Sequence, residues 1–95
     1  MANLSKKLTS EIKSIIDRML DQYEIEKYAI RVENDASGDE AIFVELWYRL
    51  DAREFDPSVI GAVQTAVSRM LQEHDEVRFP YIRHHLPEGQ KVKAA

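Results

Sequence analysis

Apolar residues near the start of the chain recur every three or four positions, which predicts an amphipathic helix over residues 4–23. At about 100° per residue these positions form a single stripe. The stripe consists of Leu4, Leu8, Ile12, Ile15, Ile16, Met19 and Tyr23. Charged side chains occupy the opposite side, so the helix has one face in water and one face that needs a packing partner.

From Tyr28 the apolar period becomes two, which is typical of a half-buried strand. Residues 34–40 are Asn, Asp, Ala, Ser, Gly, Asp and Glu, and they predict a hairpin loop because several of them tolerate tight turns. Alternation resumes over residues 42–50. A symmetric hairpin pairs Val32 with Ile42 and Ile30 with Val44, which turns the aliphatic side chains of both strands to the same side.

Asp56-Pro57 predicts the start of a second helix, since Asp caps backbone N–H groups and Pro at the first helical position loses no needed donor. Phe55 and Ile60 have the spacing of a hydrophobic staple. Gly61 lowers helix propensity by about 1 kcal/mol relative to Ala and indicates a tight contact. The apolar stripe of this helix is Val59, Ile60, Val63, Val67, Met70 and Leu71.

Residues 77–86 predict a third strand, and Pro80 places that strand at a sheet edge because proline cannot donate to a ladder. The resulting order, α-β-β-α-β, predicts an α+β two-layer sandwich with two helices on one face of a three-stranded antiparallel or mixed sheet. We expect one domain over residues 1–86 and a flexible polar tail over residues 87–95. The element order is similar to that of the small cytosolic domain ending cation-diffusion transporters, a likeness of topology that carries no motif.

Composition narrows the class of protein. Hydrophobic residues make up 44% and charged residues 32% of the 95, as in ordinary globular proteins. With 13 Lys+Arg against 17 Asp+Glu the net charge is −4, which weighs against whole-surface affinity for phosphate backbones or anionic lipid. The chain has no cysteine, so disulfides and thiol chemistry are absent. It has neither a span of about 20 apolar residues nor a signal-peptide pattern, and we expect a cytoplasmic protein.

Candidate chemistry is sparse, and we predict no enzyme, cofactor or bound metal. Only three histidines, His74, His84 and His85, are bases near neutral pH, and no serine lies in a nucleophile motif. Adjacent strand residues point to opposite faces, so His84 and His85 do not chelate one ion together. A metal-binding regulatory domain that uses one of them with His74 is an alternative. The spacing of His74 from Met70 places it on the apolar stripe, near carbonyls at the helix end.

The sheet face without helices is the most informative feature, because alternation places large aromatic and arginine side chains on it. Aromatic residues and Arg are enriched in protein interfaces, so we predict an interaction module or accessory subunit that forms a homodimer or binds another protein. Single-stranded nucleic acid stacked on the same face is an alternative, which the acidic balance disfavours. Phe79 and His85 join the face in one parity of the third strand. The predicted interface residues are Arg31, Phe43, Glu45, Trp47, Arg49, Tyr81 and Arg83.

Overall fold

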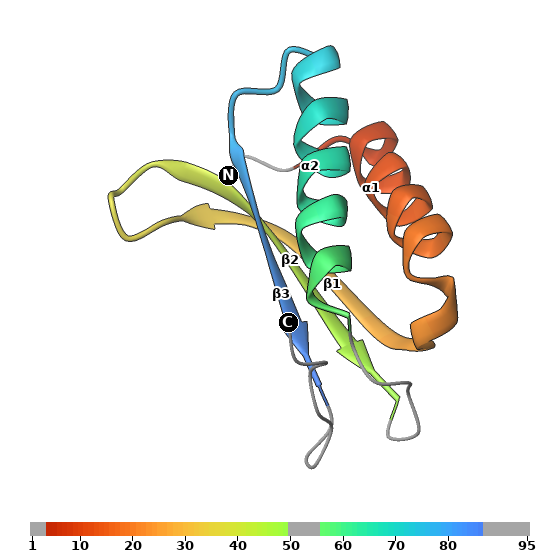
Figure 1. The fold of residues 1–95 in the computed structure, drawn as a ribbon. Coiled ribbons are helices and arrows are strands. Elements are labelled where there is room, and N and C mark those ends of the chain that lie inside the picture. Colours follow the sequence, from red (N-terminus) through yellow and green to blue (C-terminus); the bar gives the residue numbers. More distant parts are fainter. Residues whose placement is uncertain (1–3, 50–55, 87–95) are drawn as a thin grey trace.

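The computed structural model describes residues 4–49 and 56–86, which form two helices packed on one side of a three-stranded sheet (Figure 1). The predicted α-β-β-α-β order and two-layer arrangement are confirmed. A short 3₁₀ turn, η1, follows the first helix. The elements are α1 (Lys6–Met19), η1 (Asp21–Tyr23), β1 (Ile25–Asn34), β2 (Glu40–Tyr48), α2 (Pro57–Glu73) and β3 (Phe79–His85).

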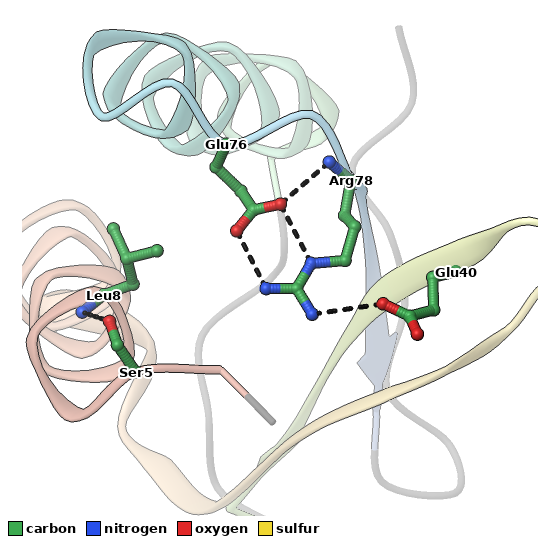
Figure 2. A network of polar contacts seen from close by, with 5 residues as sticks. All are labelled: Ser5, Leu8, Glu40, Glu76 and Arg78. Carbon is green, nitrogen blue, oxygen red and sulfur yellow. Dashed lines mark hydrogen bonds and ion pairs between the residues drawn. The ribbon is translucent and has the colours of Figure 1, made fainter. Parts of the chain in front are cut away.

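Helix α1 begins where Ser5 caps it: the Ser5 hydroxyl accepts from the Leu8 backbone N–H at 3.2 Å (Figure 2). It ends at Met19, earlier than the predicted Tyr23, because the chain tightens into η1 and then passes through Glu24 at φ 51°, in the left-handed region. Tyr23 is nevertheless buried. The apolar stripe therefore continues to the core across the break in the helix.

The hairpin of β1 and β2 has the predicted register, with Val32 opposite Ile42 and Ile30 opposite Val44. The loop between them is held by Asp35, whose carboxylate accepts from the backbone N–H groups of Ser37 (2.9 Å) and Asp39 (3.1 Å). Gly38 follows at φ 86°, a conformation that L side chains rarely adopt. Local turn chemistry thus sets the pairing of two strands whose alternating residues must share one buried face.

Both ends of α2 carry capping structures. Asp56 accepts from the backbone N–H and the hydroxyl of Ser58, at 3.0 and 2.9 Å, which confirms the predicted start. At the other end Asp75 adopts φ 58° and the Glu76 N–H donates to the Leu71 carbonyl at 2.9 Å, as in a Schellman motif. The predicted tight contact at Gly61 is wrong, because nothing lies within 4 Å of the position that a Cβ would occupy. Phe55 of the predicted staple lies outside the described residues.

Strand β3 runs parallel to β2 and lies at an edge of the sheet, whose order is β1-β2-β3. The predicted edge position is confirmed, and the sheet is mixed. The strand begins at Phe79, two residues later than expected from the pattern. The connection through α2 returns the chain to the end of the sheet at which β2 begins. Ile42 therefore lies opposite Pro80, and Trp47 opposite His85.

The core lies between the two helices and the inner face of the sheet. Ile16, Val44, Leu46, Val63 and Val67 are fully buried in it. Met19 and Ile30 are only partly buried against this cluster. Ile30 belongs to β1, an edge strand, whereas its partner Val44 lies in the central strand with a neighbour on each side. Burial is therefore greatest along β2.

Candidate interaction surface

The sheet face directed away from α1 and α2 carries a continuous layer of aromatic and charged side chains, which we call the outer face. Strand pairing arranges its residues in four rows of three across β1, β2 and β3. Row 1 is Lys27, Trp47 and His85; row 2 is Ala29, Glu45 and Arg83; row 3 is Arg31, Phe43 and Tyr81; row 4 is Glu33, Ala41 and Phe79. The open choice of parity for the third strand is thereby settled, with Phe79, Tyr81, Arg83 and His85 on the outer face.

Phe43 forms the centre of an aromatic and cationic cluster. Its ring stacks on Tyr81 with centroids 5.2 Å apart and an interplanar angle of 17°. The guanidinium carbons of Arg31 and Arg83 lie 5.2 and 5.1 Å from the Phe43 centroid, within cation–π range. Phe43 retains only 7% of its surface, so the exposure expected from alternation is wrong for this residue. The guanidinium groups of both arginines and the Tyr81 ring lie against it instead.

Trp47 forms a second cluster at one end of the face. Its ring stacks on His85, with centroids 4.7 Å apart and an interplanar angle of 11°. The Lys27 ammonium lies 4.8 Å from the Trp47 centroid. Trp47 is half-buried, with its neighbours on either strand holding the ring in place. The indole is therefore already oriented in the isolated chain.

Glu45 links the two clusters through charged hydrogen bonds. It accepts from the Arg31 guanidinium and, at 2.8 Å, from Nε2 of His85. Arg31 also pairs with Glu33. The bond from Arg31, followed by that from His85, lowers the pKa of the Glu45 carboxyl, and the same bond raises the pKa of Arg31. Arg31 and the two carboxylates that it contacts thus compensate one another's charge within the chain.

Exposed apolar surface is concentrated along β3 and the residue pair before it. Val77, before the strand, is 94% exposed, and Phe79 and Tyr81 of β3 are 54% and 36% exposed. The Phe79 and Tyr81 rings meet edge to face at 4.8 Å between centroids, and the Tyr81 hydroxyl donates to Asp35 at 3.1 Å. Large apolar groups left in water in one patch are typical of a surface that binds a partner.

Six of the seven predicted interface residues lie on the outer face. They are Arg31, Phe43, Glu45, Trp47, Tyr81 and Arg83. Arg49 follows the last residue of β2 and is exposed, and its backbone N–H donates to the Glu24 carbonyl at 3.1 Å. The pattern did not foresee Lys27, which continues the regular register of the hairpin opposite Trp47; the pairing becomes irregular only beyond this residue, between Ile25 and Lys27.

The three histidines have different surroundings. His74 lies at the C-terminal end of α2. The prediction that it belongs to the apolar stripe is wrong, because it is exposed, and its Nε2 lies 2.9 Å from a Glu11 oxygen of α1. His84 and His85 point to opposite faces of β3, as expected. Within residues 4–49 and 56–86 no group of three or more His, Asp or Glu side chains is arranged to hold a metal ion.

His84 belongs to the core side of the sheet, where sequence alone indicated no partner for it. Its Nδ1 lies 2.7 Å from the Tyr48 hydroxyl, and the two rings stack with centroids 5.9 Å apart. Burial lowers the pKa of His84 and raises that of Tyr48. Both groups are therefore neutral at physiological pH and act as packing and hydrogen-bonding elements.

A polar network that the pattern also did not foresee joins the α2–β3 connection to the hairpin. Arg78 donates from Nη2 and Nε to the two Glu76 oxygens, each at 2.8 Å, and contacts Glu40 of β2 at 3.4 Å (Figure 2). Glu40 and Arg78 are 38 residues apart in the sequence. No local spacing rule brings them together.

Comparison with known proteins gives no assignment: no protein family, curated protein or solved structure matches this chain. Over the part of the chain that the structure describes, neither helix is long and apolar enough to cross a membrane.

Proposed function

We propose that this chain is a non-enzymatic protein-interaction module that self-associates through its outer face. The observation that carries the proposal is the aromatic and arginine layer on the side of the sheet that neither α1 nor α2 covers. Aromatic residues and Arg dominate the energetically important centres of protein interfaces. A cytoplasmic location remains a prediction from the sequence.

The side chains of this layer are held before any partner arrives, which favours binding. Trp47 stacks on His85, Phe43 stacks on Tyr81, and Glu45 bonds Arg31. Ordering a long side chain at an interface costs about 0.5–1.5 kcal/mol, and a side chain that is already fixed avoids most of that cost. The outer face is therefore preorganised for docking against another surface.

The charge of the outer face favours a second copy over a nucleic acid. The face carries both signs, since Lys27, Arg31 and Arg83 stand against Glu33 and Glu45. Arg31 already pairs with both carboxylates, so its charge is not available to phosphates without disrupting that network. A surface that carries both signs is complementary to a copy of itself, as an isologous interface requires.

The size of the face indicates a weak dimer. Three strands at about 4.8 Å spacing and seven residues at about 3.3 Å rise give a planar footprint of about 330 Å². Standard interfaces bury about 800 Å² of accessible surface on each partner. We expect an equilibrium between monomer and dimer that shifts with concentration in the micromolar range or above.

Sedimentation velocity over a wide concentration series tests the proposal. The mass of the wild-type chain should rise from monomer toward dimer, and Trp47→Ala should remain a folded monomer, since losing an aromatic anchor typically costs about 2 kcal/mol or more. Ile60→Ala is the matched control, because Ile60 is 37% exposed and belongs to α2. A wild-type chain that stays monomeric at every concentration refutes self-association. Salt-sensitive quenching of Trp47 by single-stranded oligonucleotides in such a monomer would support the nucleic-acid alternative.

A further inference from the structure

The row pattern of the outer face also defines how two copies meet, an inference that rests on the proposed self-association. We infer that the copies pack face to face with their strands antiparallel, so that row 1 of one copy covers row 4 of the other and row 2 covers row 3. Each strand then lies over its own counterpart. The two-fold axis runs across the strands, between the rows of Glu45 and Phe43.

Face-to-face packing of two aligned sheets offers two orientations of the two-fold axis. If the axis is parallel to the strands, each row of one copy faces the same row of the other copy, and β2 faces β2. Glu45 then faces Glu45 and Trp47 faces Trp47, which places like charges opposite each other and two large rings in the same space. Glu45 already shares the charge of Arg31 with Glu33, so a second carboxylate at this position is poorly compensated.

An axis across the strands removes both conflicts. Lys27 of row 1 meets Glu33 of row 4 in the other copy, and two-fold symmetry makes this opposite-charge contact twice. Trp47, the largest side chain of the face, lies over the position of Ala41, a small side chain that is buried in the single chain, and so avoids the second indole. Charge and size are thus both complementary in this orientation.

The β3 side of the face is also matched under this axis. Arg83 of row 2 meets Tyr81 of row 3, a pairing suited to a cation–π contact. Arg83 forms no ion pair among the residues that the structure describes, so its guanidinium remains available to a second copy. Phe79 of row 4 lies over His85 of row 1, which covers a ring that is 54% exposed in the single chain.

Because the chain has no native cysteine, single-cysteine variants report the orientation directly. Packed sheets lie about 10 Å apart, beyond the Cα separation of about 7 Å that a disulfide tolerates, so a short bismaleimide is the suitable cross-linker. We expect covalent dimers when Lys27→Cys is mixed with Glu33→Cys, and when Phe79→Cys is mixed with His85→Cys. Ile60→Cys on α2, mixed with any of these, gives the background of random collision.

Each alternative arrangement leaves a different signature. Cross-linking of Lys27→Cys with His85→Cys, in a chain that does dimerise, indicates the axis along the strands and overturns the inference. Cross-linking at the Lys27 and Glu33 pair without the Phe79 and His85 pair indicates β1 edges paired side by side, and overturns it also. A wild-type chain that never dimerises refutes the proposed function itself, so the two failures are distinguishable.

Charge reversal gives an independent measurement on the same contact. Lys27→Glu and Glu33→Lys should each raise the dimer dissociation constant by about tenfold, because each converts two exposed ion pairs into repulsive contacts. The double variant should recover most of the wild-type affinity. Failure of the double variant to recover, with both single variants folded and weakened, contradicts the contact.

Discussion

Replacement of Glu76 by Gln should measure how strongly the α2–β3 connection is held. The Glu76 carboxylate accepts from Nη2 and Nε of Arg78, and also from the Arg78 backbone N–H at 3.0 Å. The two side chains are only 11% and 16% exposed, so water screens the pair little. Gln keeps the shape and one acceptor oxygen but removes the charge.

The size of the effect follows from the pKa of Glu76, which the hydrogen bonds from Arg78 lower from 4.5 to about 2. Each pH unit between the two values corresponds to about 1.4 kcal/mol, so the ionised carboxylate stabilises the fold by up to about 3 kcal/mol at pH 7. The folded-state pKa is depressed, and this stability is therefore present above about pH 4.5 and lost as pH falls toward 2.

Urea unfolding followed by far-ultraviolet circular dichroism at pH 7, 4 and 3 provides the measurement, at protein concentrations low enough for a monomer. Glu76→Gln should unfold more easily than the wild type at pH 7, and the gap should narrow steadily with acid. Glu73→Gln is the matched control, because Glu73 is an exposed residue at the end of α2. A gap of the same size at all three pH values, or none at pH 7, refutes the reasoning.

Further predictions concern the core. Leu46→Ala removes a fully buried side chain of β2 and should cost about 2–5 kcal/mol of unfolding free energy, and an unchanged melting temperature would contradict the assigned inner face. Burial lowers the pKa of His84 below 6.5, so the unfolded chain takes up the proton first and wild-type stability should fall as pH drops below about 6.5. His84→Gln should abolish that decline in urea titrations between pH 7 and 5, whereas the exposed His74→Gln should retain it.

Periodicity and turn chemistry predicted most of the fold because both are local. Alternation over residues 28–50 with a turn of Asp, Ser and Gly is compatible with one register, and the structure has that register. Asp56 and Pro57 marked the start of α2 for the same reason. The direction of β3 was left open, since a parallel or an antiparallel neighbour presents the same alternation to the chain.

Alternation predicted which residues belong to the outer face, but only partly how far each of them is exposed. Alternation identified Phe43 as an outward residue, but its burial depends on Arg31 from one strand and Arg83 from another, both long enough to lie across the ring. The contacts of Arg78 with Glu40 and of His84 with Tyr48 likewise join segments more than 30 residues apart. Contacts between long side chains of different strands leave no periodic pattern in the sequence, so only the folded structure shows them.

The proline of β3 has a consequence for how the protein behaves at high concentration. Pro80 has no backbone N–H, and its carbonyl already accepts from the Gln64 side chain at 2.8 Å. A strand from another chain that approached the edge of β3 would find no N–H donor at Pro80, and a carbonyl that is already hydrogen-bonded. Pro80 thus interrupts the ladder of backbone hydrogen bonds by which fibrous aggregates grow. The exposed Val77 and Phe79, which come just before Pro80, would otherwise make this edge attractive to other chains. Gln64, a residue of α2, thereby helps to keep the β3 edge of the sheet from polymerising.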